Sequence, residues 1–308
     1  MDVMKDGLRD TVPYQGATTF MRAPSTRDLD GVDIAVYGIP LDLGTINRPG
    51  ARLGPRAIRE QSLLTCGFGS IWPHDYELSE RVKFIDYGDL SFTPGYIDDM
   101  LEVTGVHLRK MIDAGISTLG LGGDHLIAYP ELYAHAQAHG PLSLIHFDAH
   151  ADNYESDRLN HGSMFWFAAD EGLIDPKRSV QVGIRTPWDG DNGFTVLSAN
   201  ECNRMSSDQI VARIRDVVGD SPCFVSLDVD GMDPAYTPGT GTPVPGGITS
   251  MMQREILWGL KGINAVGGDV VEVSPPYDHN GATAIVASYV AADILYLLAE
   301  NRRNKARQ

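Results

Sequence analysis

The chain has 308 residues, and its 41 acidic residues outnumber the 25 basic ones, which gives a formal net charge of −16. This acidity argues against a nucleic-acid-binding protein, because affinity for the phosphate backbone depends on clustered Lys and Arg. A hydrophobic content of 43% and a charged content of 21% are ordinary for a globular protein. The only basic cluster is a run typical of a solvated helix end: Arg302, Arg303, Lys305 and Arg307.

The cysteine content and the N-terminal sequence favour a cytoplasmic protein. Cys66, Cys202 and Cys223 are too few and too scattered for a disulfide framework, and they suit a reducing compartment. The N-terminal sequence MDVMKDGLRDTVPYQG lacks the apolar segment of a secretory signal. Gly, Asp or His interrupts the longest apolar runs before the ~18 residues that a membrane span needs, so we expect no membrane association.

Short apolar segments alternate with longer amphipathic ones along most of the chain, and no linker or repeat divides it. We predict an irregular N-terminal arm over residues 1–30 and one domain over residues 31–308. The short segments are rich in β-branched residues and almost continuously apolar, which is typical of strands buried on both faces of a parallel sheet. The predicted strands are Asp33–Tyr37, Val82–Asp86, Ser117–Leu121, Leu142–Phe147, Ser179–Ile184, Cys223–Leu227 and Ala265–Val273.

Several of the longer segments have the apolar spacing and end signals of helices. A Ser-Ser-Asp opening and a closing Gly frame one of them, and Gly residues end two others. The alternation of strands and helices predicts a layered α/β fold with a parallel sheet, whose functional groups gather at the carboxyl ends of the strands. The predicted helices are Tyr96–Ala114, Pro130–His139, Ser207–Val218 and Thr283–Glu300.

Acidic residues and histidines cluster directly after the predicted strands. Asp148, His150 and Asp152 follow one strand at a spacing of two, so an extended chain would point all three to the same side. Buried carboxylates are normally paired or bound to metal, because an unpaired charge is costly to bury. Asp228 and Asp230 repeat the pattern on another strand, and they would repel one another unless a cation lay between them.

Four carboxylates and two imidazoles make up a candidate metal-ligand set. That number exceeds the three protein ligands of a typical catalytic zinc, and it suits two cations about 3.5–4 Å apart that share bridging carboxylates. Oxygen and imidazole ligands without a thiolate favour Mn²⁺, Fe²⁺ or Ni²⁺ over a structural zinc. We assign the neighbouring His146 to the core. The candidate ligands are His125, Asp148, His150, Asp152, Asp228 and Asp230.

The motifs around these residues resemble the signatures of the ureohydrolases, the family of arginase, agmatinase and related amidino hydrolases. The HGSMF and DNGF segments, and the form of the Pro-Gly-Thr-Gly-Thr-Pro loop, are more similar to agmatinase than to arginase. The resemblance covers most of the chain. It is carried by RPGARLGPRAIR (48–59), GGDH (122–125), HFDAHAD (146–152), HGSMFWFAADEGLIDP (161–176), SLDVDGMDPAYTPGTGTP (226–243) and VEVSPPYD (271–278).

The resemblance implies a three-layer α/β/α fold of the arginase/deacetylase type, with a parallel sheet of about eight strands. It also implies two Mn²⁺ ions per subunit, with Ni²⁺ as the alternative, and a homo-oligomer that is a trimer or a hexamer. Asp148 and Asp228 would bridge the two ions. His125 and Asp152 would complete one metal site, and His150 and Asp230 the other.

The implied reaction is hydrolysis of a guanidino C–N bond to urea and an amine. The guanidinium carbon is a poor electrophile, and two metals would lower the pKa of a bridging water so that hydroxide is available near pH 7. By resemblance, Asp152 would bind one ion and accept a hydrogen bond from that hydroxide. Glu272 would hold the guanidinium through paired N–H···O bonds, and His161 would carry a proton to the leaving amine.

Agmatine is the first candidate substrate, with putrescine, a precursor of the polyamines, as the amine product. The segment between Asp152 and His161 is the expected rim of the site, and we assign Asn153, Glu155 and Asp157 to substrate binding. Glu155 and Asp157 would either meet the ammonium group of agmatine or be solvated loop acids. The global negative charge would favour the approach of a dication.

Three alternatives remain open. Arg158 would suit a guanidino acid such as 4-guanidinobutyrate or 3-guanidinopropionate. A biguanide or alkylguanidine such as metformin would instead use apolar walls, for which Phe165, Trp166 and Trp188 are candidates. The non-enzymatic alternative is a catalytically silent subunit of a mixed oligomer, and the complete ligand set argues against it.

Overall fold

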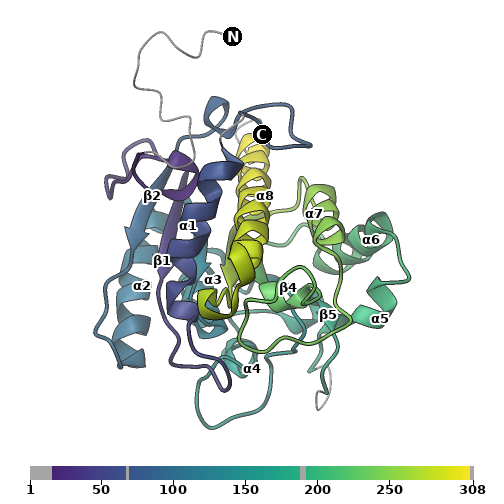
Figure 1. Cartoon of the computed structure of the whole chain (residues 1–308). Helices are drawn as coiled ribbons and strands as arrows, with labels where there is room; N and C mark the ends of the chain where they lie inside the picture. Colours follow the sequence, from purple (N-terminus) through teal and green to yellow (C-terminus); the bar gives the residue numbers. More distant parts are fainter. Residues whose placement is uncertain (1–15, 67–68, 188–191, 306–308) are drawn as a thin grey trace.

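An eight-stranded sheet forms the centre of the computed structural model, which describes residues 16–66, 69–187 and 192–305, with side chains up to residue 302. All pairs of neighbouring strands are parallel, in the order β2-β1-β3-β8-β7-β4-β5-β6 (Figure 1). The strands are β1 (Ile34–Ile39), β2 (Phe84–Asp89), β3 (Ser117–Gly122), β4 (Ser143–Phe147), β5 (Val180–Ile184), β6 (Thr195–Ser198), β7 (Cys223–Asp228) and β8 (Ala265–Val271).

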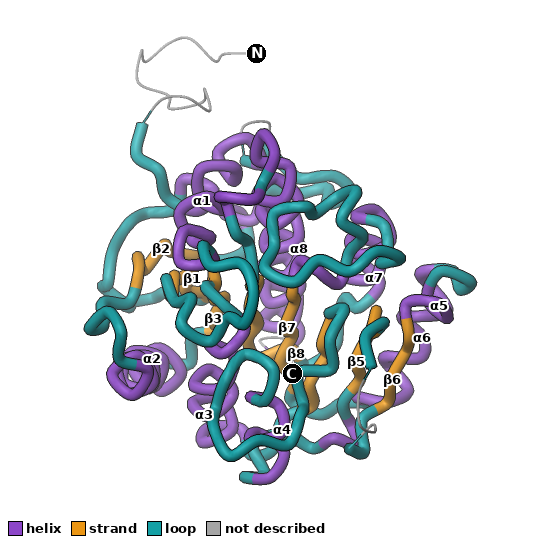
Figure 2. Tube along the Cα trace, turned by 60° about the horizontal axis from the view of Figure 1, so that its bottom comes forward, coloured by secondary structure: helices purple, strands orange, loops and turns teal. Residues whose placement is uncertain are grey.

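Helices cover both faces of this sheet and give the three-layer α/β/α architecture (Figure 2). Successive strand residues point to opposite faces, so Ile34 and Val36 join one hydrophobic cluster and Ala35 and Tyr37 the other. The first cluster includes α1 (Gly54–Thr65), α6 (Ser207–Val218), α7 (Ser250–Gly259) and α8 (Ala282–Lys305). The second includes α2 (Ile97–Asp113), α3 (Ala128–His139) and α4 (Met164–Asp170). The short α5 (Ala199–Cys202) follows β6.

The predicted α/β class, the parallel sheet, the seven predicted strands and the four predicted helices are confirmed. Helix α6 begins with a capping box formed by its N-cap Ser206 and its third residue Gln209, and it ends before Gly219, which has a positive φ of 54°. The sequence pattern does not predict β6, a four-residue edge strand in which only Leu197 is buried. Within the predicted arm, Phe20 is buried in the core and its backbone N–H donates to Asp86 Oδ2 at 2.7 Å.

Helix α8 corrects the expectation that no apolar run reaches the length of a membrane span. The segment Ala282–Arg302 is long and apolar enough to cross a bilayer, but 78% of its most apolar window is buried inside the protein. It packs against α1, α7 and β8. A helix whose surroundings are the protein's own apolar side chains satisfies the same composition test as a membrane span, and α8 is such a core helix.

Candidate active site

Four neighbouring strands bring the predicted site residues to one edge of the sheet. Asp148 directly follows β4, Asp228 ends β7, and Glu272 directly follows β8. His125 lies three residues beyond β3. Because these strands are parallel and adjacent, their carboxyl ends meet, and residues that are up to 147 positions apart in the sequence come into contact.

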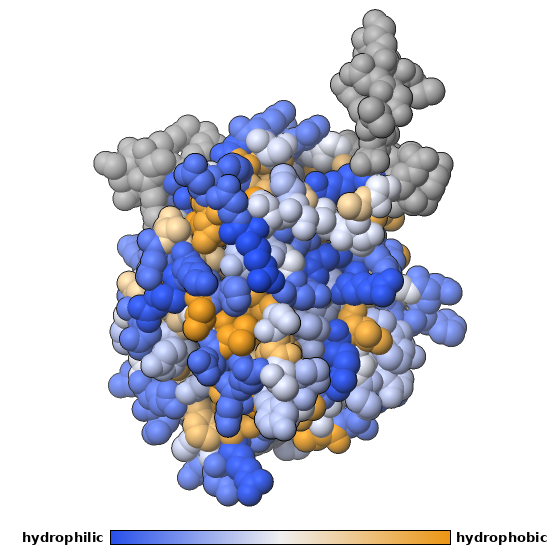
Figure 3. Space-filling view, turned by 90° about the vertical axis from the view of Figure 1, so that its left-hand side faces the viewer, coloured by the Kyte–Doolittle hydropathy of each residue, from blue (hydrophilic) through white to orange (hydrophobic). Residues whose placement is uncertain are grey.

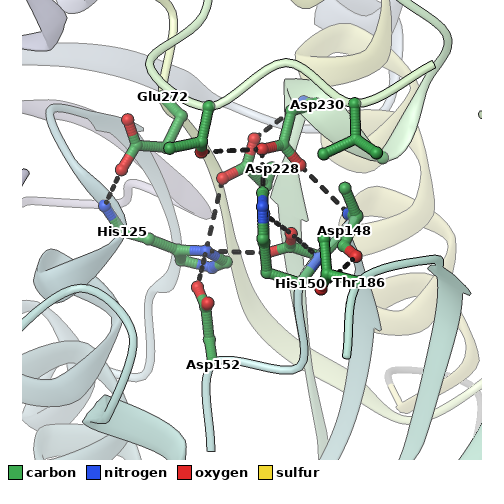
Figure 4. A network of polar contacts seen from close by, with 12 residues as sticks. His125, Asp148, His150, Asp152, Thr186, Asp228, Asp230 and Glu272 are labelled. Atoms are coloured by element: carbon green, nitrogen blue, oxygen red, sulfur yellow. Dashed lines mark hydrogen bonds and ion pairs between the residues drawn. The ribbon is translucent and has the colours of Figure 1, made fainter. Parts of the chain in front are cut away.

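Two of the acidic residues have left-handed backbone conformations. Asp152 has a φ of 47° and Glu272 a φ of 64°. Such a conformation costs a non-glycine residue about 1–3 kcal/mol and persists only where the surrounding structure imposes it. Here it turns the chain away from the strand direction, and both carboxylates face the cluster at the sheet edge (Figure 4).

Three carboxylates surround the imidazole of His125. Its Nδ1 lies 3.1 Å from Asp148 Oδ2, 3.1 Å from Asp152 Oδ2 and 3.6 Å from Asp228 Oδ2 (Figure 4). His125 and Asp148 are fully buried, and Asp152 and Asp228 are nearly so. These four residues are the set that the family resemblance assigns to one metal ion.

A second group forms around His150. Its Nδ1 lies 3.1 Å from Asp230 Oδ2 and 3.3 Å from Asp148 Oδ1. Burial alone would lower the pKa of His150, but the hydrogen bonds to Asp148 and Asp230 outweigh it and raise the pKa to about 12. The side chain of Asp148 therefore faces both histidines.

The donor groups at this edge fit divalent cations. The Nδ1 atom of His125 is buried and makes no regular hydrogen bond within the described part of the chain, although carboxylate oxygens surround it. Burial and repulsion by Asp230 and Asp148 raise the pKa of Asp228, and burial and repulsion by Asp148 raise that of Asp230 to about 6. The free imidazole nitrogen and the carboxylates around it together form a set of possible metal ligands. Bound cations would neutralise the negative charge of these mutually repelling carboxylates.

His146 lies beside this cluster and is hydrogen-bonded at both ring nitrogens. Its Nε2 is 2.8 Å from Asp148 Oδ2, and its Nδ1 is 3.1 Å from Gln181 Nε2. The Gln181 amide nitrogen also donates to the carbonyl oxygen of Ala151 at 2.6 Å. His146 therefore orients the carboxylate of Asp148 and has no ring nitrogen left for a cation.

Glu272 connects the ligand cluster to His161. Its Oε1 accepts from the backbone N–H of His125 at 3.0 Å and lies 3.1 Å from His161 Nδ1, whereas its Oε2 is buried without a hydrogen-bond partner among the described residues. Burial would lower the pKa of His161, but the hydrogen bond to Glu272 outweighs this effect and raises it. Glu272 thus keeps one carboxylate oxygen free for a further donor.

A cavity of about 350 Å³ opens onto the cluster. Of the predicted substrate-binding residues, the exposed Glu155 and the buried His161 line it. The exposed Asp157 and the buried Asn153 and Glu272 are not among the lining residues, and Glu272 contacts the lining through its hydrogen bond to His161. The lining consists of Ile46, His150, Asp152, Tyr154, Glu155, Ser156, Asn160, His161, Gly162, Ser163, Asp228 and Thr242.

The candidate aromatic walls lie elsewhere. Phe165 is fully buried and packs edge-on against His125, with ring centroids 5.3 Å apart, so it belongs to the core beneath the cluster. Trp166 contacts Phe167 and does not line the cavity, and Trp188 lies outside the described residues. A separate groove of about 690 Å³ between α2 and α3 contains none of the predicted site residues. Figure 3 shows the side of the molecule where α2 lies, with scattered hydrophobic patches among hydrophilic side chains.

Three further residues of the site are not predicted by the sequence pattern. Ile46 is 82% exposed and lines the cavity, Thr242 donates to Asp230 Oδ2 at 3.2 Å, and Asp124 accepts from the backbone N–H of Gly44 at 2.7 Å. Burial and the nearby Glu272 raise the pKa of Asp124 to about 7. The motifs GGDH and Gly-Thr-Gly-Thr-Pro contain two of these residues, whereas nothing in the sequence marks Ile46.

Comparisons with known proteins agree with this geometry. The model of the arginase family matches residues 32–296. The agmatinase of Serratia proteamaculans is 45% identical over 268 residues, which are 87% of this chain and 88% of that protein. A crystal structure described as a hypothetical agmatinase from Burkholderia thailandensis superposes with a TM-score of 0.93 at 46% identity and covers 95% of this chain and 94% of its own. Proclavaminate amidino hydrolase from Streptomyces clavuligerus superposes with a TM-score of 0.90 at 38% identity, over 94% and 99% of the two chains.

Proposed function

Because the chain belongs to the arginase family, we propose that it hydrolyses agmatine to putrescine and urea at a centre of two divalent cations. The observation that carries this proposal is the convergence of six His and Asp side chains at the carboxyl ends of adjacent strands, beside a cavity with an acidic rim. The family relationship makes the chain a hydrolase of guanidino C–N bonds. The choice of agmatine is supported by relatives named agmatinase that share 42–45% of their residues with it.

We assign the bridging positions to Asp148 and Asp228, which face the histidines from two strands. His125 and Asp152 complete one set of ligands, and His150 and Asp230 the other. When bound, two such cations supply an activated water at neutral pH and electrostatic stabilisation of developing negative charge. The carboxylate of Asp152 lines the cavity, and it would hold one of the ions and accept a hydrogen bond from the activated water.

Glu272 and His161 have complementary roles in this proposal. The free Oε2 of Glu272 accepts N–H bonds from the planar guanidinium and so fixes the orientation of the carbon to be attacked. His161, which hydrogen-bonds to the other oxygen of Glu272 and lines the cavity, holds the proton that the leaving amine needs. The raised pKa of His161 favours its protonated form in the resting enzyme.

The rim favours a substrate with a second positive charge. Glu155 lines the cavity and provides a carboxylate for the ammonium group of agmatine. Arg158, which would suit a guanidino acid, is exposed and is not among the lining residues. Guanidino acids remain the second candidate because the amidino hydrolase of S. clavuligerus is similar over nearly the whole chain.

We further propose Mn²⁺ as the resident metal, with Ni²⁺ as the alternative, and a homo-oligomer of three or six subunits. The oxygen-rich ligand set with two imidazoles supports the choice of metal. The low number and scattered positions of the cysteines support a reducing, cytoplasmic location.

The test is an assay of urea release by protein loaded separately with Mn²⁺ and Ni²⁺. The substrates are agmatine, arginine, 4-guanidinobutyrate, 3-guanidinopropionate and a biguanide. We expect agmatine to lead by at least about tenfold in kcat/KM, which is about 1.4 kcal/mol of transition-state preference. Turnover of another guanidine with inert agmatine would contradict the substrate assignment and leave the reaction class intact. Fewer than two bound ions and no turnover would instead indicate a silent subunit.

A further inference from the structure

A chain of buried polar side chains leads from helix α3 to His125 on the side remote from the cavity. It consists of Glu131 on α3, Asp269 on β8 and Ser226 on β7, and all three are fully buried. None of them lines the cavity. A buried polar atom without a hydrogen-bond partner is costly. The hydrogen bonds among these three side chains therefore determine which atom carries each proton.

The first step concerns Ser226. Its hydroxyl donates to Asp269 Oδ1 at 2.8 Å, and the backbone N–H of Leu227 donates to the same oxygen at 3.2 Å. A serine hydroxyl has one hydrogen, so the 2.8 Å contact between Ser226 Oγ and His125 Nε2 requires the imidazole to be the donor. The proton of neutral His125 therefore lies on Nε2, and the lone pair of Nδ1 faces the carboxylate cluster.

The second step concerns Asp269 and Glu131. Asp269 Oδ2 and Glu131 Oε2 are both buried and have no donor among the described side chains, yet the two carboxyl groups are in hydrogen-bonding contact. One proton between them supplies the partner that each lacks. Asp269 Oδ1 already accepts from Ser226 Oγ and from the backbone N–H of Leu227, as an ionised carboxylate does, so Glu131 is the member that carries this proton. Burial and the neighbouring Asp269 also raise the pKa of Glu131.

The surroundings of Glu131 are built to hold it in this position. The Tyr37 hydroxyl donates a short hydrogen bond to Glu131 Oε1. A side chain at position 120 would overlap that oxygen, so the glycine on β3 leaves the space that the carboxyl group occupies. Glu131 can then donate from one oxygen to Asp269 while its other oxygen accepts from Tyr37.

We propose that Glu131, Asp269 and Ser226 are positioning residues, which fix the ring orientation and the Nε2–H form of His125 for binding a divalent cation. The inference rests on the metal centre of the proposed function. Partners of this kind behind a metal-binding histidine typically change metal affinity by 10–100-fold when they are removed. If these three side chains only stabilised the core, substituting them would change the unfolding temperature and leave the metal affinity unchanged.

The first experiment compares Ser226→Ala with Ser143→Ala. Ser143 is a matched control because it is equally buried on the neighbouring strand β4, and its hydroxyl has no hydrogen-bond partner among the described residues. Binding is measured by titration of metal-free protein with Mn²⁺, with free Mn²⁺ followed by electron paramagnetic resonance. We expect Ser226→Ala to weaken the binding of one of the two Mn²⁺ ions by about 10–100-fold and to leave the binding of the other unchanged. For Ser143→Ala, we expect Mn²⁺ affinities within about twofold of those of the unsubstituted protein.

The second experiment compares Glu131→Gln with Glu131→Leu. Glutamine can still donate to Asp269 and accept from Tyr37, so we expect rescue, with Mn²⁺ affinity within about threefold of the unsubstituted protein. Leucine removes both contacts, and we expect about a tenfold loss at the same ion. This pair also tests the inference if Ser226→Ala does not fold, which circular dichroism and thermal unfolding would reveal.

The outcomes separate this inference from the proposed function. Fewer than two bound ions in the unsubstituted protein would overturn the metal centre itself. Two ions there, with Ser226→Ala indistinguishable from Ser143→Ala, would leave the metal centre intact and overturn the positioning role. Equal losses in Glu131→Gln and Glu131→Leu would contradict the neutral, proton-donating form of Glu131.

Discussion

Glu272 divides its two carboxylate oxygens between the protein and the proposed substrate. Oε1 is occupied by the backbone of His125 and the ring of His161, and Oε2 is free. We predict that Glu272→Gln retains two bound metals and loses about 10²–10³-fold in kcat/KM, because a neutral amide cannot form the charge-assisted bonds to a guanidinium. Steady-state kinetics with metal analysis checks this, and unchanged kinetics would show that Glu272 does not hold the substrate.

Glu155 and Asp157 provide a matched pair of exposed loop acids. Glu155 lines the cavity and Asp157 does not. We predict that Glu155→Gln raises KM for agmatine about three- to fivefold with a smaller effect on kcat, because an exposed ion pair contributes about 1 kcal/mol or less. Asp157→Asn serves as the control and should match the unsubstituted enzyme within about twofold. Equal effects of the two substitutions would show that Glu155 acts only through the general negative charge of the rim.

The proposed metal ligands are predictable from sequence because Asp and His at close spacing directly follow apolar segments. The residues behind them are not, since Ser226 and Asp269 lie within apolar strands and Glu131 lies in a helix without an acidic neighbour. Their relationship to His125 exists only in the folded sheet, where β3, β8 and β7 are adjacent. The same limit applies to Asn153 and Asp157, whose positions relative to the cavity depend on how the loop folds.

At the scale of elements, the segment Asp42–Gly50 forms a fixed loop beside the cavity. The backbone N–H of Gly50 donates to Asp42 Oδ2 at 3.0 Å, and the backbone N–H of Gly44 donates to Asp124 Oδ2 at 2.7 Å. The side-chain amide of Asn47 donates to the carbonyl oxygen of Gly241 at 2.9 Å. These bonds hold the exposed side chain of Ile46 at the lining.

We predict that Ile46 contacts the methylene chain of the substrate. For a series of ω-guanidinoalkylamines, each methylene up to the length of agmatine should raise kcat/KM about fourfold, which corresponds to ~0.8 kcal/mol per buried CH₂. Ile46→Asn should reduce this increment towards twofold or less and leave metal content unchanged. An unaltered chain-length series in the variant would contradict the contact.

Helix α3 gives the protein a proton-dependent stability at His135. This side chain is fully buried, with Nε2 2.8 Å from Thr118 Oγ1, and burial followed by repulsion from His139 lowers its pKa to about 3. Between pH 6.5 and 3 the unfolded chain binds a proton at this residue that the folded protein does not, so stability falls as pH falls through that range.

We therefore predict that His135→Gln removes about 1.4 kcal/mol per pH unit from the acid slope of the unfolding free energy between pH 6 and 4. Denaturant unfolding of metal-free protein at several pH values measures this slope. Chelated samples are needed because acid also releases bound cations. Parallel pH profiles for the two proteins would contradict the prediction.

Two of the elements that the sequence analysis missed are short. The edge strand β6 has four residues and a mixed burial pattern, and α4 has seven residues, so neither is long enough to establish a periodicity. Helix α1 begins with Gly54 and Pro55 directly after a short 3₁₀ turn, and its N-terminal signals resemble those of a loop. Long strands with buried faces and capped helices such as α6 carry their signals locally.

For the molecule as a whole, bound cations should stabilise the fold by joining distant parts of the chain. His125, Asp148 and Asp228 lie at the ends of three different strands, and without metal the carboxylates of Asp148 and Asp228 repel one another. At a concentration 100 times the dissociation constant, one Mn²⁺ should add about 2.7 kcal/mol to the free energy of unfolding. Scanning calorimetry with and without chelator checks this, and Asp148→Ala should lose turnover and metal binding and show no metal-dependent rise in Tm.

The position of β8 affects how the protein can be made. This strand is the last of the eight in sequence and lies between β3 and β7, so it joins the group β2-β1-β3 to the group β7-β4-β5-β6. While the chain emerges from the ribosome, the sheet remains in two separate groups until residues 265–271 are available, and His125 stays apart from Asp148 and Asp228. Binding of a cation by His125 together with Asp148 and Asp228 would therefore follow insertion of the final strand. A chain that stalls before residue 265 exposes two unpaired strand edges to chaperones and to aggregation.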